Sequence, residues 1–337
     1  MPLIQHSDLP AFTRLRGEGI EVVPAEQAAG YGLPELHIAV LNLMPDTALR
    51  ATDRQFARLV ASSADSANLW FHVFTMGVEA RGAAAREHIA AHYETLDSIR
   101  ERPVDALIVT GANPSYVDMT REAFWPGLFE VFSWADRAIH SKLCSCFATH
   151  AVFKLYWGVE RVRLPQKMWG VYSHRIAGDS DLLSSLREPV AAPHSHYYDL
   201  SRQQMESVGA TVLMESDEAG VHMAVHDDFE FVFFQGHPEY DDISILKEYK
   251  REVWRFVTQR RATYPHTPEH YFTESALEVL EDYRSLVLYR DENDPIPGFP
   301  EHELEEGLTN TWRAPGMMIY RNWLQKVLDR KMRQPPL

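Results

Sequence analysis

The segment LCSCFATH, residues 143–150, decides the fold, because it runs from a short strand directly into a helix. We expect Leu143–Ser145 to form the strand and Phe147–Tyr156 the helix, with Cys146 at their junction. Similar alternation extends along the chain before this segment. Strands that alternate with helices form a mostly parallel sheet with helices on both faces. The segment therefore predicts an α/β architecture.

Apolar runs before this segment continue the alternation. We expect strands at Leu36–Leu43, Leu69–Phe74 and Val104–Val109, and helices at Thr52–Ala61, Ala83–Tyr93 and Ala123–Ile139. The strand runs are short and largely apolar, whereas helical spacing places apolar residues three and four positions apart. This half of the chain therefore predicts parallel strands joined by helices.

The pattern changes after residue 200. Three expected strands follow one another without helices, at Ala210–Leu213, Val221–Val225 and Phe229–Phe234, which predicts an antiparallel extension of the sheet. Helices are expected at Ile243–Phe256 and Met317–Met332, and the apolar stripe of the second could cover the core or a second subunit. Between them, the Pro-, Asp- and Glu-rich stretch Thr263–Pro300 predicts irregular surface structure.

Length and charge restrict the class of protein. The chain has 337 residues, of which 45% are hydrophobic, and a formal net charge of -15. We expect one domain, 1–337, with a core at about 35–260 and with an N-terminal arm (1–34) and a C-terminal extension (261–337) packed on it. An acidic chain is a poor binder of nucleic acids or anionic membranes. Without a signal pattern or a run of ~20 apolar residues, we expect a soluble cytoplasmic protein.

The two cysteines, Cys144 and Cys146, are too close for an unstrained disulfide. Cys146 stands at the amino end of the predicted helix, where the helix dipole favours a nucleophilic thiolate. The amide of Phe147 would then face a developing oxyanion. The alternative is that the cysteine is a small buried hydrophobe, which is the role expected of Cys144 within the strand.

Two further loops follow predicted strands and would meet the cysteine loop at the same edge of the sheet. In Gln235-Gly236-His237-Pro238-Glu239, His237 could act as a general base, and Glu239 could accept its other ring N–H. In the loop 110–115, Gly111 could let backbone amides approach an anionic oxygen, although for this motif alone a simple turn is the favoured interpretation. His194 and His196 are one residue apart without a nearby carboxylate cluster, so no metal site is expected there.

Cys146, His237 and Glu239 together resemble the triad of class I glutamine amidotransferases. More widely, the chain resembles the homoserine O-acyltransferases (the homoserine O-succinyltransferase family) of methionine biosynthesis. The motifs that carry this resemblance are 9–11 with 15–16, 42–45, 110–112, Lys167 with 170–172, 192–195, 236–241, and 312–313 with 322–324. The resemblance implies a class I glutamine amidotransferase-like (flavodoxin-like) fold, with the late strands and the C-terminal helices added to it.

The same resemblance implies a ping-pong acyl transfer. Cys146 would take a succinyl group from succinyl-CoA and pass it to the γ-hydroxyl of L-homoserine, with His237 as base. The resemblance assigns Arg251 to the substrate carboxylate, and Lys167 and Ser195 to the active site. Phe147 and the Gly111 loop would bind the oxyanion. It implies no metal and no cofactor, since acyl-CoA is a co-substrate, and it implies a homodimer.

Several residues depart from the family pattern. Asp46 and Thr47 stand where lysines are usual, Asn113 where proline is usual, and His150 where glutamine is usual. These changes leave L-serine open as an acceptor. Ser115 occupies the position at which glycine goes with succinyl-CoA and glutamate with acetyl-CoA. An uncharged serine favours succinyl-CoA, with acetyl-CoA as the alternative donor and glutamine hydrolysis as a more remote activity.

Overall fold

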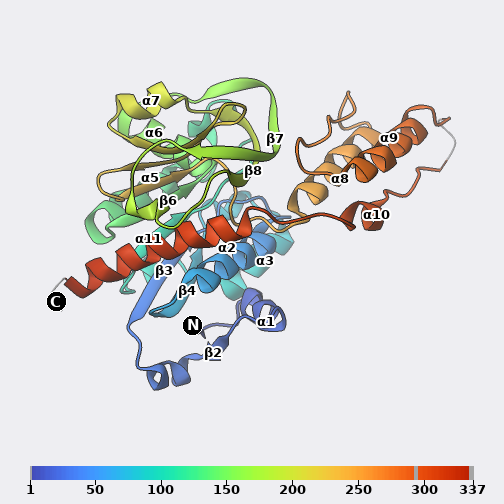
Figure 1. Ribbon diagram of the computed structural model, residues 1–337. Helices are drawn as coiled ribbons and strands as arrows, with labels where there is room; N and C mark the ends of the chain where they lie inside the picture. The colour runs from blue at the N-terminus through green and yellow to red at the C-terminus, as the bar shows by residue number, and fades with distance from the viewer. Residues whose placement is uncertain (1, 292–294, 334–337) are drawn as a thin grey trace.

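The computed structural model describes residues 2–291 and 295–333, and an eleven-stranded sheet forms its centre (Figure 1). In spatial order the strands are β2 (Val22–Pro24), β1 (Leu3–Gln5), β4 (Asn68–Phe74), β3 (Glu35–Leu41), β5 (Ala106–Val109), β6 (Ser141–Ser145), β11 (Phe231–Phe234), β10 (Gly220–His226), β9 (Thr211–Ser216), β7 (Val162–Ile176) and β8 (Val190–Asp199).

The sheet has a parallel part and an antiparallel part. All neighbouring strands from β2 to β11 run parallel, and β10, β9, β7 and β8 continue the sheet with antiparallel pairing. The predicted α/β class and the antiparallel extension are therefore confirmed. The sequence reading had no counterpart for β7 and β8. The first half of β7 carries Pro165 and charged, exposed residues, which hide its strand pattern.

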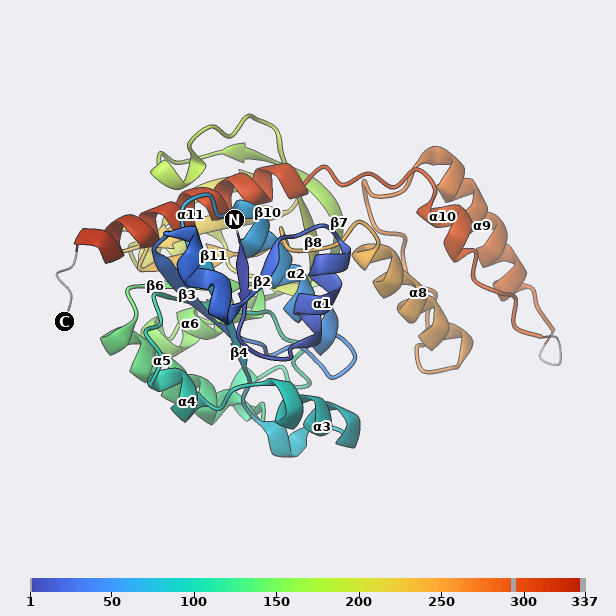
Figure 2. The same cartoon turned by 90° about the horizontal axis from the view of Figure 1, so that it is seen from below.

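Helices cover both faces of the parallel part, as Figure 2 shows from below. On one face α1 (Pro10–Gly17), α2 (Leu49–Ser63) and α11 (Arg313–Arg333) pack against alternate strand residues such as Ile38 and Val40. On the other face α4 (Leu96–Arg100), α5 (Trp125–Ala138), α6 (Phe147–Trp157) and α7 (Arg202–Ser207) contribute to the core that contains Ala39 and Leu41. The short helix α3 (Ala83–His92) packs beside the start of α2.

Three helices form a lobe beside the sheet: α8 (Ser244–Val257), α9 (Glu274–Leu288) and α10 (Glu301–Glu305) (Figure 1). The expectation of irregular structure over 263–300 is wrong for α9. Its buried residues Ala276, Leu280, Tyr283 and Val287 are spaced as a helix requires. Thr273 caps its first turn by accepting from the amide of Ala276 at 3.2 Å. The abundance of acidic and proline residues around α9 masked this stripe.

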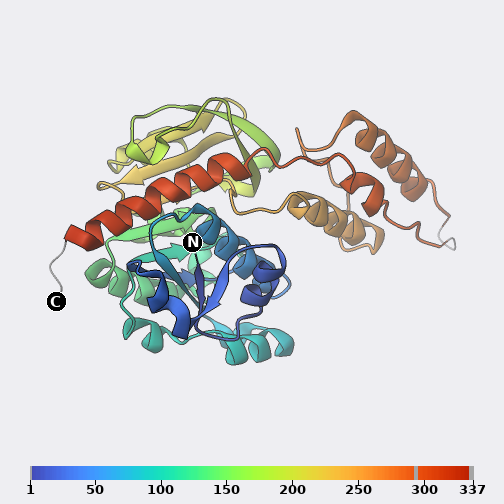
Figure 3. The same cartoon turned by 60° about the horizontal axis from the view of Figure 1, so that its bottom comes forward.

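The long helix α11 returns from the lobe and crosses the sheet (Figure 3). Tyr320, Trp323 and Leu324 are buried in the core that α2 shares, so the predicted apolar stripe covers this chain's own core. Trp323 also donates to the hydroxyl of Ser141 on β6 at 2.8 Å. Among the helices that the structure describes, none has the length and apolar character needed to span a bilayer.

Candidate active site

The three predicted loops meet at the carboxyl ends of β5, β6 and β11, which are neighbours in the sheet. The amide of Cys146 donates to the carbonyl of Phe234 at 2.6 Å, which joins the second loop to the third. A Cβ built on Gly111 would lie 3.6 Å from Cβ of Cys146 and 3.7 Å from Cε1 of His237. The structure thus brings Gly111, Cys146 and His237 together, as the sequence predicts.

Cys146 forms a strained elbow between β6 and α6. Its backbone has φ 51° and ψ -106°, a conformation that residues other than glycine rarely adopt. Strain of this kind is typical of nucleophile elbows, which expose a side chain at the top of a sheet. Phe147 follows as the first residue of α6, so its amide has no partner within the helix and can face an anion.

His237 is oriented by Glu239. Its Nδ1 donates to Oε1 of Glu239 at 2.8 Å, and both side chains are buried. Burial lowers the pKa of His237, but the Glu239 carboxylate and a hydrogen bond with Cys146 oppose this and raise the pKa to about 10. At neutral pH the ring is therefore an imidazolium, which is suited to pairing with a thiolate.

Gln235 and His150 add a contact to the sulfur that the sequence reading did not anticipate. The Nε2 of Gln235 lies 3.8 Å from Sγ of Cys146. Its Oε1 accepts from Nε2 of His150 at 2.8 Å, which fixes the amide with its N–H₂ toward the sulfur. Burial lowers the pKa of His150 to about 3, so the ring stays neutral and keeps one ring nitrogen for this bond. The unusual residue at position 150 therefore belongs to the support of Cys146.

A second polar group lies next to the triad and is centred on Glu248 of α8. Its Oε2 accepts from Oγ of Ser195 at 2.5 Å and lies 3.1 Å from Nζ of Lys167. Its Oε1 accepts from the hydroxyl of Tyr240 at 2.8 Å. Burial raises the pKa of Glu248, but Lys167 and the bonds from Ser195 and Tyr240 lower it to about 2. The carboxylate thus stays charged.

Tyr240 connects this group to the triad, because its ring stacks on the His237 ring with centroids 4.4 Å apart. Arg251 lies one turn after Glu248 on α8, and its charge also lowers the pKa of that carboxylate. The Arg251 side chain is 47% exposed and lies a loose 3.7 Å from Glu252, and this exposure leaves it accessible to a ligand. The sequence analysis did not identify Glu248. Its position three residues before Arg251 was a usable signal, because residues at that spacing share one face of a helix.

Ser115 stands apart from these groups. It is exposed on the loop after Gly111, and the neighbouring amide of Tyr116 donates to Oε1 of Glu122 at 2.8 Å. Its role in donor choice stays a prediction.

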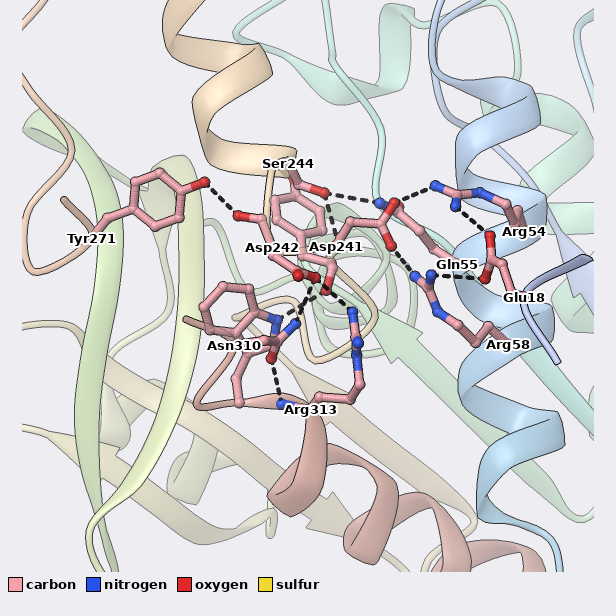
Figure 4. Close-up of polar contacts among 12 residues, drawn as sticks. Glu18, Arg54, Gln55, Arg58, Asp241, Asp242, Ser244, Tyr271, Asn310 and Arg313 are labelled. Atoms are coloured by element: carbon pink, nitrogen blue, oxygen red, sulfur yellow. Dashed lines mark hydrogen bonds and ion pairs between the residues drawn. The ribbon is translucent and has the colours of Figure 1, made fainter. Parts of the chain in front are cut away.

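The loop that carries His237 is held by ion pairs from distant parts of the chain (Figure 4). Asp241 accepts from Arg54 and Arg58 of α2, and both arginines also bind Glu18, at 2.7 Å and 3.1 Å. The next residue, Asp242, accepts from Arg313 at the start of α11 at 2.7 Å.

Two further residues complete this support. The indole of Trp312 donates to the carbonyl of Tyr240 at 3.0 Å, and Asn310 lies 3.3 Å from Oδ1 of Asp242. We call the set Glu18, Arg54, Arg58, Asp241, Asp242 and Arg313 the loop clamp. The clamp links segments near both ends of the described chain to the loop of His237.

Comparison with known proteins identifies the family of the chain. A sequence model of homoserine O-succinyltransferases matches residues 2–333. The chain is 46% identical to a homoserine O-succinyltransferase of Methylococcus capsulatus, with 99% of this chain and 96% of that protein covered. It is 44% identical to one of Nitrosococcus oceani, with 97% and 92% covered. Among solved structures, a glutamine amidotransferase from Methylobacillus flagellatus is similar with a TM-score of 0.48 at 15% identity, over 87% of this chain and 95% of that one. The chain belongs to the homoserine O-succinyltransferase family.

Proposed function

We propose that this protein transfers a succinyl group from succinyl-CoA to the γ-hydroxyl of L-homoserine through an acyl-enzyme on Cys146. The observation that carries the proposal is the meeting of Cys146, His237 and Glu239 at one edge of the sheet, in a chain of this family. No step of the transfer needs a cofactor, because acyl-CoA is a co-substrate. We further propose that the protein acts in the cytoplasm, as a homodimer.

In the first half-reaction the Cys146 thiolate attacks the thioester carbonyl of the donor. A new C–S bond forms, and the negative charge moves to the carbonyl oxygen, which the amides of Phe147 and the Gly111 loop would bind. Collapse of this intermediate breaks the bond to CoA, and His237 gives its proton to the leaving thiolate. The two thioesters are similar in energy, so the exchange needs no other source of free energy.

The second half-reaction depends on a change at His237. Once Cys146 is acylated, the sulfur no longer carries a charge or binds the imidazolium, so one cause of the raised His237 pKa is removed. The neutral ring can then take the proton of the γ-hydroxyl, whose oxygen attacks the acyl carbon. Breaking the bond to Cys146 releases O-succinylhomoserine and regenerates the thiolate. Glu239 keeps the ring oriented in both halves.

For the acceptor, we propose that Arg251 binds the α-carboxylate, because a guanidinium pairs with a carboxylate through two parallel hydrogen bonds. Lys167 and Ser195 lie in the same group around Glu248. Glu248 acts as a positioning residue: it fixes Lys167 and Ser195, and through Tyr240 it supports the ring of His237.

The proposal is tested by incubating the protein with succinyl-CoA or acetyl-CoA in the absence of any acceptor. Peptide mass analysis should show one succinyl group on Cys146, together with one equivalent of free CoA. Adding L-homoserine should then discharge the acyl-enzyme faster than adding L-serine does. Release of CoA only in the presence of acceptor would contradict the ping-pong order, and ammonia release from glutamine would favour a glutaminase.

The choice of donor is tested separately with S115E. A glutamate facing the free succinyl carboxylate at ~4 Å would add about 4 kcal/mol of repulsion at an effective dielectric constant of ~20. We therefore expect S115E to lose at least about a hundredfold in kcat/KM for succinyl-CoA and to keep most of its rate with acetyl-CoA. An unchanged ratio of the two donors would show that Ser115 does not select the donor.

A further inference from the structure

Three buried histidines from separate strands converge behind the loop of His237. His174 lies on β7, His194 on β8 and His222 on β10, and each is at most 2% exposed. One ring nitrogen from each lies within 4.8 Å of the other two. None of the three takes part in the acyl transfer proposed above, so their convergence needs a separate explanation.

Hydrogen bonds to backbone carbonyls determine which nitrogens carry protons. Nδ1 of His196 lies 2.8 Å from the carbonyl of Tyr198, and a carbonyl can only accept, so this nitrogen carries the proton. In the neutral ring, Nε2 of His196 is then an acceptor. Nδ1 of His194, 3.0 Å away, must donate to it. The remaining nitrogen of His194, Nε2, is therefore left with a free lone pair.

The same reasoning applies to His174. Its Nδ1 lies 3.2 Å from the carbonyl of Val190 and must donate, so its Nε2 also carries a lone pair. The two Nε2 atoms of His174 and His194 are 3.1 Å apart. Two lone pairs facing each other at this distance repel, unless a positive charge lies between them.

A proton between these atoms would create an imidazolium in an unfavourable place. The ring neighbours of the three histidines are one another, His196 and the aromatic rings of Tyr172 and Phe234. Burial among such groups disfavours a charged ring, and within residues 2–291 and 295–333 no carboxylate pairs with any of the three. A metal cation fits better, since it binds the neutral imidazoles through these lone pairs.

The spacing of His174 and His194 suits a tetrahedral ion. Ligand nitrogens at the usual zinc distance of about 2.0–2.1 Å are about 3.3 Å apart in tetrahedral geometry, close to the 3.1 Å between the two Nε2 atoms. His222 offers the third ring nitrogen of the group. A Cβ on Gly236 would lie 2.9 Å from Nε2 of His194 and 2.7 Å from Nδ1 of His222, so only glycine keeps this position open.

We propose that His174, His194 and His222 bind a divalent transition-metal ion, and that this ion is zinc. The carbonyl of Val190 and the ring of His196 act as outer partners that fix the ligand rings, as in many metal sites. His196 is thus not a ligand. Of the two residues His194 and His196, for which no metal was expected, His194 is a ligand in the three-histidine group and His196 supports it. The ion ties β7, β8 and β10 together beneath Gly236, one residue before His237, and its role is structural.

The test measures bound metal in the full-length protein. The chain is produced in medium supplemented with Zn²⁺, freed of loosely bound metal by dialysis against a mild chelator, and analysed by mass spectrometry of the elements. We expect about one zinc per chain in the wild type, and a loss of at least fivefold in H174Q and in H222Q. H226Q is the matched control on the same strand, and C146A is the control for the active-site thiol. Both controls should keep the wild-type content.

Production with Co²⁺ gives a second readout that needs no variant. The wild type should show the strong visible absorption of a four-coordinate Co²⁺ ion without a thiolate charge-transfer band in the near ultraviolet. A wild type without stoichiometric metal, or an H222Q protein that keeps its zinc, would overturn the proposal. Loss of metal in C146A, or a thiolate band in the cobalt spectrum, would place the ion at Cys146 and overturn it equally.

Discussion

Cys146 and His237 meet at one edge of the sheet, but the two are held there by different means. The elbow of Cys146 is fixed by hydrogen bonds to the backbone of β6 and β11, since its amide donates to the carbonyl of Phe234 at 2.6 Å and the hydroxyl of Thr149 donates to the carbonyl of Cys144 at 3.0 Å. The loop of His237 is fixed by charged side chains of α2 and α11. The nucleophile therefore depends on the sheet itself, whereas the base depends on long-range ion pairs that single substitutions can weaken without unfolding the sheet.

The largest expected effect concerns the elbow. C146A should lower kcat by about 10⁴-fold or more, because no acyl-enzyme can form. C144A is the matched control, because Cys144 lies two residues earlier on β6 and is wholly buried. This variant should keep most of the activity. Steady-state rates with succinyl-CoA and L-homoserine measure both. Equal losses in the two variants would show that the elbow position does not define the nucleophile.

The next effect concerns the partner of the base. E239Q should lower kcat by about 10²–10³-fold, since the imidazolium loses its charged acceptor. The Glu239 carboxylate raises the pKa of His237, so its removal should lower that pKa. The imidazolium would then be lost at lower pH, and the alkaline limb of kcat/KM for the donor should move to lower pH. A near-normal kcat with an unmoved limb would exclude Glu239 from the triad.

A smaller effect is expected at the acceptor site. R251K should raise the KM for L-homoserine about tenfold, because lysine cannot pair with a carboxylate through two parallel bonds. The KM for succinyl-CoA should change much less. R255K, one turn further along α8, is the control. A similar rise in both KM values would argue that Arg251 acts on the fold or on CoA rather than on the amino acid.

The smallest effect tests the loop clamp directly. D241N keeps a hydrogen-bonding side chain but removes the charge that Arg54 and Arg58 share, so we expect kcat to fall about three- to tenfold through a less well placed His237. E18Q weakens the ion pairs that the same two arginines make with Glu18, on the side away from the loop. This variant should therefore lower kcat less. If D241N loses activity no more than E18Q does, the clamp does not position the base.

The difference between local contacts at Cys146 and long-range contacts at the loop of His237 also explains which parts of the site the sequence could predict. Cys146, Gly111 and the His237–Glu239 pair each follow a strand, and neighbouring parallel strands bring their loops together, so local patterns were sufficient. The loop clamp and Glu248 depend on contacts such as Arg58 with Asp241, which lie far apart in the sequence. The helix α9 was missed for a local reason, because acidic residues and prolines surround its apolar stripe.

The composition of the loop clamp also has a consequence for biosynthesis. Glu18 and α2 leave the ribosome long before His237, but Arg313 follows His237 by the length of the whole lobe. All residues that make the hydrogen bonds of the Cys146 elbow are therefore present before α11 emerges, whereas the loop of the base lacks one of its ion pairs until then. We expect nascent chains that stop before Arg313 to react with a thiol-specific reagent as the full chain does, yet to release CoA from a donor more slowly. Such a delay would reduce the consumption of acyl-CoA by an unfinished chain.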